Sequence, residues 1–266
     1  MTVGVVGLGV VGGTLRDAFE RREIATVGYD PYLGIGARSD LLACGIVFVC
    51  VSTPAPSSGG YDLAEVWAAS ETIAAHASAG TIVAIRSTVA PGTTDRLQIR
   101  FPDLRFASVP EFLVAENPAG SFQHADRIVI GTSQQDVYEA LAELLMVVIH
   151  TSRVLHVMPV EAELIKVCSG ALLAAKVAMA NELFEVCTRY GVDWRVVQQG
   201  VGMDRRIGPS HLTVTDERGF GGACLPKDLD GLITAARLAG YEPTLLARVA
   251  GFNRSIRKAP RRANAR

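Results

Sequence analysis

The sequence lacks the long apolar run of a membrane protein: in its 266 residues no such run reaches the roughly 18 residues that a transmembrane helix needs. It also lacks a secretion signal at its start, because Met1-Thr2-Val3 leads directly into an apolar stretch without a basic segment and a cleavage site. These two absences predict a cytoplasmic protein that has no membrane partner.

The sequence also has no excess of positive or negative charge. Lys and Arg number 26 and Asp and Glu number 27, which gives a formal net charge of -1 and no general attraction for nucleic acid. We therefore expect no nucleic-acid partner, and an anionic ligand must be bound by a local site. At 49% hydrophobic and 20% charged residues the composition is that of a core-forming protein and excludes a largely disordered chain.

Cysteine is scarce and irregularly placed. The five cysteines form an odd set without a CxxC pair or Cys/His ligand spacing, which excludes a disulfide framework and a zinc site. The histidines form no spaced pair either, so we predict no metal. Four cysteines lie in apolar segments and are expected to be buried packing residues: Cys44, Cys50, Cys168 and Cys187.

Short apolar runs alternate with helix-like stretches in the first part of the chain. The runs are apolar on both faces, which is typical of a parallel sheet covered by helices on both sides. We predict a Rossmann-type doubly wound α/β domain over residues 1–157. Its expected strands are 3–6, 25–29, 46–51, 81–85, 105–109 and 127–130, and its expected helices include 10–21 and 63–76.

The second part of the chain is helical instead. From Pro159 to Tyr190 there is one Gly and no internal Pro, and Gly191 follows, so one long helix is predicted. An all-α domain is expected over 158–257, followed by a frayed basic tail over 258–266. The long helix is too apolar to stand in solvent, and we expect it to pack on the first domain and on a second subunit in a homodimer. Further helices are expected at 194–200, 227–239 and 244–256.

A glycine-rich turn joins the first expected strand to the first expected helix. Gly7-Leu8-Gly9-Val10-Val11-Gly12 fits the GxGxxG pattern in that context. The glycines allow a tight turn, close approach of the backbone to a pyrophosphate and close helix packing, with the phosphates at a helix N-terminus. Asp30 ends the second strand about 18 residues later, where a carboxylate accepts hydrogen bonds from ribose hydroxyls and repels a 2′-phosphate. We predict NAD as the cofactor, bound by Gly7, Gly9, Val10, Val11, Gly12 and Asp30; the alternative is a turn that binds another ligand.

Two polar loops follow the next strands. Ser52 and Thr53 come after the third strand, and Ser87 and Thr88 come after the fourth. Open parallel sheets bind ligands outside the carboxyl ends of their strands. We therefore assign Ser52, Thr53 and Ser87 to the cofactor site.

The most informative stretch of the second half is Gly219-Phe220-Gly221-Gly222-Ala223-Cys224-Leu225-Pro226-Lys227-Asp228. Its glycines free the backbone to wrap a ligand, and Lys227 and Asp228 open the next helix. A thiol at a helix N-terminus beside an ammonium group has its thiolate form favoured, which makes it a better nucleophile. We therefore predict that Cys224 is a nucleophile.

Five motifs together resemble those of the UDP-glucose/GDP-mannose dehydrogenase family. They occur in the family's order over nearly the whole chain. They are Gly7 to Gly12, Pro110-Glu111-Phe112-Leu113, Ile165-Lys166, Arg206-Ile207-Gly208 and Gly219 to Asp228.

The resemblance implies a reaction with NAD on a nucleotide sugar of the UDP-glucose or GDP-mannose type, in polysaccharide biosynthesis. Two successive hydride transfers would take a primary alcohol to an aldehyde and then, through a thiohemiacetal and a thioester on Cys224, to a carboxylate. Asp228 and Lys166, with a water, would handle the alcohol proton and polarise the oxyanion. Glu111 or Thr88 would hold the hydrolytic water.

The resemblance also implies the residues that hold the ligands. Phe112 and Leu113 would contact the sugar nucleotide together with Phe220 and Gly221 of the cysteine loop. Lys227 would help at the cofactor, and Arg206 would reach across the dimer interface to the neighbour's substrate, since a bidentate guanidinium suits a phosphate. From the residues alone, Glu111 could instead cap its own loop and Lys166 could be a solvated helix residue.

The chain departs from the family at several points. Family members carry a third domain, which would begin where this sequence ends, and a longer link between Asp30 and Ile46. The family's second glutamate is Ala115 here, with Glu116 one place further on, and its asparagine four residues after the helix lysine is Gly170. Losing one oxyanion or water-positioning donor typically costs on the order of 10² to 10³ in rate.

Three functions therefore remain open from the sequence. The first is a short nucleotide-sugar dehydrogenase that makes a uronate. The second is a dehydrogenase of the same fold that acts on a different or smaller phosphorylated substrate or stops at the aldehyde. The third is a subunit with little catalytic activity that binds NAD or a sugar nucleotide beside a partner protein.

Overall fold

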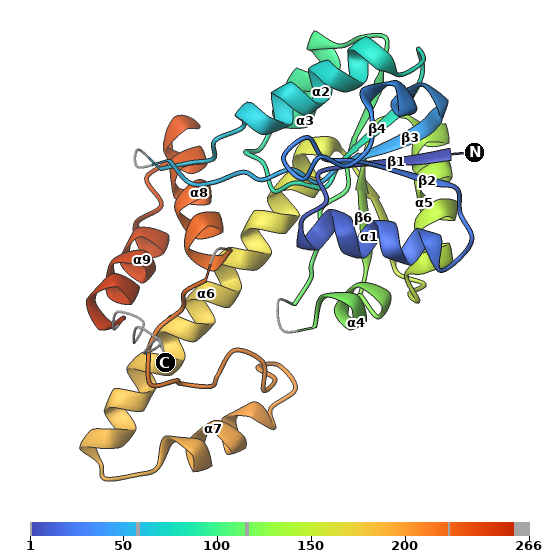
Figure 1. Cartoon of the computed structure of the whole chain (residues 1–266). Coiled ribbons are helices and arrows are strands. Elements are labelled where there is room, and N and C mark those ends of the chain that lie inside the picture. The colour runs from blue at the N-terminus through green and yellow to red at the C-terminus, as the bar shows by residue number, and fades with distance from the viewer. Residues whose placement is uncertain (1, 57–58, 115–116, 223, 258–266) are drawn as a thin grey trace, which may run out of the picture. The chain divides into compact units, whose positions relative to one another are not determined.

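The computed structural model of the chain describes residues 2–56, 59–114, 117–222 and 224–257 (Figure 1). Its contacts divide the chain into two compact units, which we call unit 1 (residues 1–57 and 61–166) and unit 2 (residues 58–60 and 167–266). The predicted basic tail and the positions Ala115 and Glu116 lie outside the described residues.

Unit 1 contains a seven-stranded sheet in the order β2-β1-β3-β4-β5-β6-β7. Strands β1 to β5 pair in parallel with their neighbours, and so does β6 with β7. This confirms the doubly wound α/β fold expected from the apolar runs. The strands are β1 (Thr2–Val6), β2 (Thr26–Tyr29), β3 (Cys44–Val49), β4 (Ile82–Ile85), β5 (Arg105–Ser108), β6 (Ile128–Gly131) and β7 (Val154–Val157).

Helices cover both faces of this sheet (Figure 1). Strand β3 is apolar on both sides and so needs cover on both. Ile46 and Phe48 are fully buried in the core on one face of the sheet, and Val47 and Val49 are fully buried in the core on the other face. The first face packs against α1 (Val10–Glu20), α4 (Pro118–Gln123) and α5 (Gln135–Val148). The second packs against α2 (Ala64–His76), α3 (Thr93–Arg100) and the 3₁₀ segment η1 (Arg38–Ala43).

The sheet differs from a wholly parallel one between β5 and β6. These strands are joined through a single antiparallel residue pair, Ser108 with Gly131. The connection between them carries the short α4, whereas parallel neighbours are usually linked by a full crossover helix. Gly131 also lies under the first turn of α6 (Pro159–Arg189), where an added Cβ would come within 2.6 Å of the Cβ of Ala162.

Unit 2 is built around the helix α6, which begins in unit 1 and runs for 31 residues. Its bounds agree closely with the predicted long helix. The shorter helices are α7 (Trp194–Gly202), α8 (Leu225–Leu238) and α9 (Thr244–Ile256). Ala174 and Val177 of α6 form a core with Leu229 and Ile233 of α8 and Ala250 of α9.

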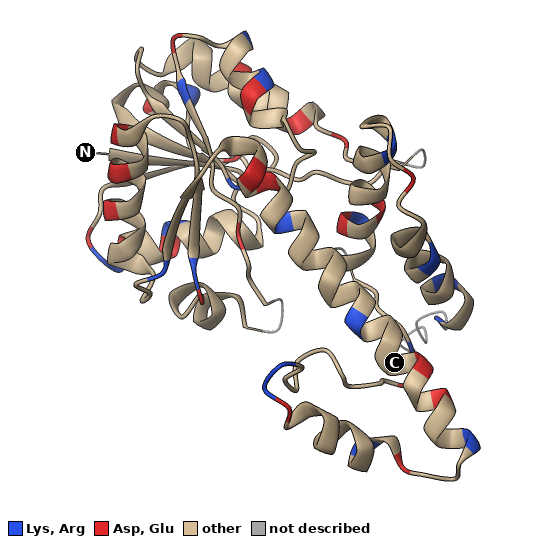
Figure 2. Ribbon diagram, turned by 180° about the vertical axis from the view of Figure 1, so that it is seen from behind, with Lys and Arg blue, Asp and Glu red and all other residues tan. Residues whose placement is uncertain are grey.

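The middle of α6 is poor in charge. Between residues 167 and 181 Lys176 is the only charged residue, and the ribbon of this helix is accordingly mostly tan in Figure 2. Large apolar side chains of α6 are exposed in the single chain, among them Leu172 at 72% and Met179 at 58%. Even so, no helix within the described residues is long and apolar enough to cross a membrane.

The carboxylate of Glu163 anchors the start of α6 to the start of α3. The side chain is buried and accepts hydrogen bonds from the backbone N–H groups of Gly92 (2.5 Å) and Thr94 (2.8 Å) and from the hydroxyl of Thr94 (2.7 Å). Burial raises the pKa of Glu163, while the three donors and the positive end of the α3 dipole favour its charged form. The acid therefore caps a helix other than its own.

We expect the substitution Glu163→Ala to lower the free energy of unfolding by about 2–4 kcal/mol, because buried donors at the α3 N-terminus would lose their acceptor. Urea denaturation followed by circular dichroism measures this change. Glu182→Ala, at an exposed site on the same helix, is the matched control and should change stability by less than about 0.5 kcal/mol. Equal stability of the two variants would contradict the capping role.

Candidate active site

The glycine-rich turn between β1 and α1 is as tight as the sequence predicted. Gly7 has φ +85°, and a Cβ there would lie 2.8 Å from the carbonyl oxygen of Cys50. A Cβ on Gly12 would collide with the carbonyl oxygen of Gly7, so helix and strand pack without a side chain between them. Gly9, in contrast, is the N-cap of α1 and faces open space. The first turn of α1 contains no acidic residue.

Asp30 fixes the shape of this turn from the end of β2. Its side chain is buried, with Oδ2 accepting the N–H of Leu8 at 2.8 Å and Oδ1 accepting the N–H groups of Tyr32 and Leu33 at 3.0 and 3.2 Å. Each carboxylate oxygen has more than one lone pair, so the acid can still accept a ribose hydroxyl. An open helix N-terminus next to a fixed carboxylate fits a dinucleotide such as NAD.

Hydroxyl groups tie the loops after β3 and β4 together. Thr53 Oγ1 donates to the carbonyl of Thr88 at 2.7 Å, and Ser87 Oγ donates to that of Val51, also at 2.7 Å. Thr53 and Ser87 are buried, whereas Ser52 is exposed. The two loops thus form one hydrogen-bonded rim at the carboxyl ends of the strands.

Glu111 and Lys166 come together in unit 1. Lys166 Nζ lies 3.3 Å from Glu111 Oε1, and their side chains are only 15% and 13% exposed. The other carboxylate oxygen of Glu111 accepts the N–H of Leu113 at 2.6 Å. Glu111 thus fixes its own loop and pairs with the lysine, and Lys166 is not a solvated helix residue.

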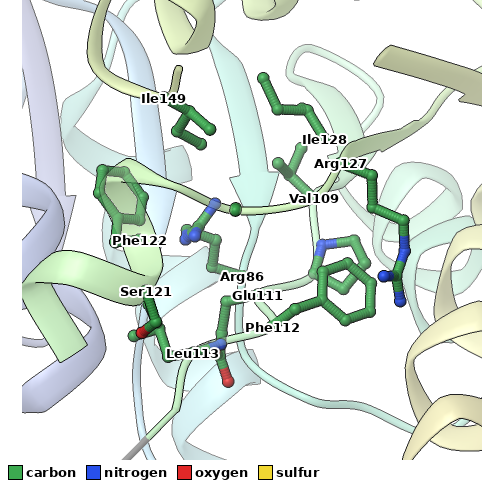
Figure 3. Close-up of a pocket in the computed structure, with 12 residues that line it drawn as sticks. Arg86, Val109, Glu111, Phe112, Leu113, Ser121, Phe122, Arg127, Ile128 and Ile149 are labelled. Carbon is green, nitrogen blue, oxygen red and sulfur yellow. The ribbon is translucent and has the colours of Figure 1, made fainter. Parts of the chain in front are cut away.

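The ring of Phe112 lies between two cations. The guanidinium of Arg127 is 4.0 Å from the ring centroid, and Lys166 Nζ is 5.7 Å away. Figure 3 shows Arg127 beside this ring at the edge of a small cavity. Such cation–π contacts hold the aromatic ring in one orientation.

The cavity contains a buried arginine that the sequence analysis did not single out. Arg86, after β4, is 4% exposed, lies over the ring of Phe122 and has an Nε atom without a hydrogen-bond partner. Burial lowers the pKa of Arg86, and the nearby Glu111 opposes that shift. The cavity has a volume of about 20 Å³, enough for about one water. Nothing in the sequence marks Arg86 as a site residue; its position near Glu111 becomes visible only in the fold.

Cys224 lies at the start of α8 in unit 2. It is the N-cap residue of this 14-residue helix, and it is exposed. In the first turn of α8, Lys227 Nζ is 3.8 Å from Asp228 Oδ1, and Asp228 is 3% exposed. The thiol, the ammonium group and the buried acid therefore occupy one helix N-terminus, as predicted.

Two buried asparagines hold the glycine-rich loop before Cys224. Asn253 of α9 accepts the N–H of Phe220 at 2.7 Å and donates to its carbonyl at 2.9 Å. Asn181 of α6 accepts the N–H of Gly219 at 3.0 Å and the Nε–H of Arg218 at 2.9 Å. Gly219 has φ +56°, and a Cβ there would collide with Asn253. Residues 218–220, at the start of the loop, are thus held by side chains that are far away in sequence.

The structure shows how Phe220 is held in this loop. Its side chain is 4% exposed in the apolar core of unit 2, and both of its backbone groups pair with Asn253. Phe220 therefore anchors the loop by packing, and its predicted contact with the substrate stays a prediction. Gly221 is covered by the guanidinium of Arg257, into which a Cβ would project.

Sequence profiles of one family match most of the chain. The NAD binding domain of the UDP-glucose/GDP-mannose dehydrogenase family matches residues 36–149, and the central domain of that family matches residues 160–255. The chain belongs to this family. Its unit 1 accordingly carries the family's NAD-binding domain.

Individual proteins similar to this chain support the same family. UDP-glucose 6-dehydrogenase of Pseudomonas aeruginosa is 35% identical over 219 residues, which cover 78% of this chain and 48% of that protein. The enzyme of the same name from Haloferax volcanii is 33% identical over 245 residues, covering 86% and 54%. A solved UDP-glucose dehydrogenase from Pyrobaculum islandicum superposes with a TM-score of 0.87 at 29% identity, covering 96% of this chain and 68% of that one. The chain spans about half the length of the two sequence relatives.

The family position occupied by Gly170 has a physical explanation here. Gly170 is buried against α8, and a Cβ would lie 3.3 Å from the Cβ of Asp228 and 3.4 Å from its Oδ2. Contacts this short are tighter than ordinary packing. The glycine therefore lets the first turn of α8 approach α6 closely.

Arg206, the residue that the family resemblance places at a neighbour's substrate, is exposed in the single chain. Its guanidinium forms a two-point contact with Asp204, with Nε–Oδ1 at 3.0 Å and Nη2–Oδ2 at 2.6 Å. Lys176 of α6 donates to the carbonyls of Ile207 and Gly208 at 2.6 and 3.2 Å and so holds this segment in place.

The remaining cysteines differ from one another more than the sequence suggested. Cys44 is buried, but Cys168 is exposed, so the expectation that it is buried was wrong: it lies on an outward face of α6. Burial raises the pKa of Cys50 to about 12. The described residues contain no group of three or more His, Cys, Asp and Glu side chains placed to hold a metal ion.

We expect iodoacetamide at pH 8 to modify Cys224 within minutes and Cys50 only after denaturation. At a pKa of about 12 only about 1 in 10⁴ of the Cys50 thiols is ionised at that pH. Peptide mass spectrometry of timed samples measures both rates, and the exposed Cys168 serves as the control for simple accessibility. Modification of Cys50 as fast as of Cys168 would contradict the raised pKa of Cys50.

Proposed function

We propose that this chain oxidises the primary alcohol of a nucleotide sugar with NAD, and that Cys224 carries the substrate as a thioester. The observation that supports this most directly is the position of Cys224. Its thiol is exposed at the N-terminus of α8, the preceding loop is held by Asn181 and Asn253, and Lys227 lies in the same helix turn. A helix N-terminus favours the thiolate that such chemistry needs.

Each residue has a chemical task in this proposal. NAD, held by the turn from Gly7 to Gly12 and by Asp30, supplies the hydride acceptor of both oxidations. Lys166, kept in place by Glu111, donates a hydrogen bond to the developing oxyanion, and pre-positioned donors of this kind contribute about 3–4 kcal/mol to a reaction barrier. Asp228 accepts the alcohol proton through a water. The Cys224 thiolate would add to the aldehyde to give a thiohemiacetal, and loss of a hydride from this carbon in the second oxidation would give the thioester. A water directed by Glu111 would then displace the Cys224 thiolate and leave the carboxylate.

A second possibility is an enzyme that stops at the aldehyde. It is favoured by Gly170, which cannot donate the hydrogen bond that the family's asparagine would provide. The proposal of a full four-electron oxidation therefore rests on Lys166 and Asp228 without this additional donor.

We expect two equivalents of NADH for each equivalent of nucleotide sugar consumed, when a panel of UDP- and GDP-sugars is followed at 340 nm together with product analysis. The variant Cys224→Ser should make acid at least about 10³-fold more slowly, because a hydroxyl is a far weaker nucleophile than a thiolate. Cys168→Ser removes another exposed thiol and should leave the rate unchanged.

Two results would contradict this proposal. One equivalent of NADH with accumulation of aldehyde would show that the oxidation stops halfway. Undiminished acid formation by Cys224→Ser would remove the thioester from the mechanism. Binding of NAD without turnover of any sugar nucleotide would instead support a subunit that acts beside a partner protein.

We also propose that the chain forms a homodimer through α6 and α7. Large apolar side chains on these two helices are exposed in the single chain, and a concentration of such side chains usually marks an interface. They include Leu172, Met179 and Val186 on α6 and Val196 on α7, with Met203 just after it.

Light scattering at micromolar concentration should give twice the 28.3 kDa mass of the chain. Replacing Met179 with Glu would place a charge in this patch and should shift the equilibrium towards the monomer, since burying an unpaired charge costs several kcal/mol. Arg254→Glu, on the outer side of α9, is the control. A compact monomer of the wild-type chain would rule out the interface.

A further inference from the structure

An exposed aromatic side chain is fixed at both ends beside the cofactor turn. Tyr32 follows β2 and is 79% exposed. Its backbone N–H donates to Asp30 Oδ1 at 3.0 Å, and its hydroxyl donates to Glu65 Oε1 at 2.6 Å in the first turn of α2. The side chain therefore connects the loop after β2 to the first turn of α2 and is largely exposed.

The loop that carries Tyr32 is built to hold this position. Asp30 and Ile35 form an isolated antiparallel bridge, with hydrogen bonds of 2.9 and 3.0 Å between their backbones. Gly36 has φ +73° and packs directly on the carbonyl of Gly28, where a Cβ would not fit. A rigid seven-residue excursion thus presents an aromatic ring that no described apolar cluster covers.

Covalent connectivity places the base of a bound dinucleotide near this ring. The carboxylate at the end of β2 accepts hydrogen bonds from the hydroxyls of the adenosine ribose. The base is attached to the carbon next to the one that bears the 2′-hydroxyl, so it lies within a few ångströms of Asp30. The backbone N–H of Tyr32 donates a hydrogen bond to that same carboxylate.

We propose that Tyr32 is the surface on which the adenine of NAD stacks, and that Glu65 is the positioning residue that orients its ring. This inference rests on the proposed binding of NAD by unit 1. An aromatic ring fixed before the ligand arrives loses little entropy on binding and stacks on any base through its face. The pKa of Tyr32 is raised, first by its hydrogen bond to Glu65 and then by the charge of that acid, so the ring stays neutral at physiological pH.

The same pair selects against a phosphorylated cofactor. The 2′-phosphate of NADP would approach Asp30, which accepts the backbone N–H of Tyr32, and Glu65, which accepts its hydroxyl. Arg38, the first residue of η1, donates its Nε–H to the hydroxyl of Tyr29 at 3.0 Å. Glu65 thus contributes to the preference for NAD as well as to the orientation of the ring.

Calorimetric titration of the full chain with NAD, NADP and nicotinamide mononucleotide tests the proposal. Tyr32→Ala should weaken the binding of NAD by about 5- to 100-fold, the range for loss of one base–aromatic stack, and should leave the mononucleotide, which has no adenine, unchanged. Tyr32→Phe keeps the ring and should stay within about threefold of wild type. Glu65→Gln should raise the ratio of NADP to NAD affinity by about fivefold, the effect of one screened charge.

A matched control is Tyr241→Ala, which removes a tyrosine that is 66% exposed in unit 2. Equal NAD affinity of Tyr32→Ala and wild type would overturn the stacking role while leaving the proposed function intact. Failure of the wild-type chain to bind NAD would overturn the proposed cofactor and this inference together.

Discussion

The carboxylate of Glu163 is the contact on which the arrangement of the charged residues in unit 1 depends. It joins the first turn of α6 to the N-terminus of α3 through three buried hydrogen bonds. Lys166 follows three residues later on the same helix, so the position of its ammonium group relative to Glu111 is set by this anchor. Because the donors at a helix start must be satisfied when they are buried, α6 cannot shift along α3 without breaking them. The ion pair of Lys166 with Glu111 is a consequence of that constraint.

Other acceptors in the protein solve the same problem. Glycine-rich turns leave backbone N–H groups without partners, and a buried acid or amide from a distant segment accepts them: Asp30 does so for Leu8, and Asn253 does so for Phe220. Glycine removes the side chain that would block this approach, and the acceptor fixes a backbone that would otherwise be flexible. The backbone at Leu8 and at Phe220 is therefore held in place before any ligand binds, which lowers the entropy lost on binding.

Regular patterns in the sequence were enough to predict the framework. Strand β3 is apolar on both faces and α6 has no internal proline, so each stands out locally; the glycine turn and Cys224 also occur within short motifs. Contacts between distant segments were not predictable. Arg86 is an ordinary basic residue in sequence, and only the fold buries it beside Glu111; the bond between Tyr32 and Glu65 spans 33 residues. The exposed Cys168 was wrongly assigned because an apolar neighbourhood in sequence does not say which face of a helix a residue occupies.

Gly170 shows why a single missing side chain cannot be interpreted from sequence alone. In sequence, a glycine in place of the family's asparagine removes a hydrogen-bond donor and suggests a weakened site. In the structure, however, the absence of a Cβ lets Asp228 come within van der Waals distance of the α6 backbone, and an added Cβ would meet Asp228 at 3.3 Å. An asparagine at this position would require Asp228, in the first turn of α8, to move by a few tenths of an ångström. The glycine and the close packing of α8 on α6 therefore belong together, and the missing donor has to be judged together with the space that it frees.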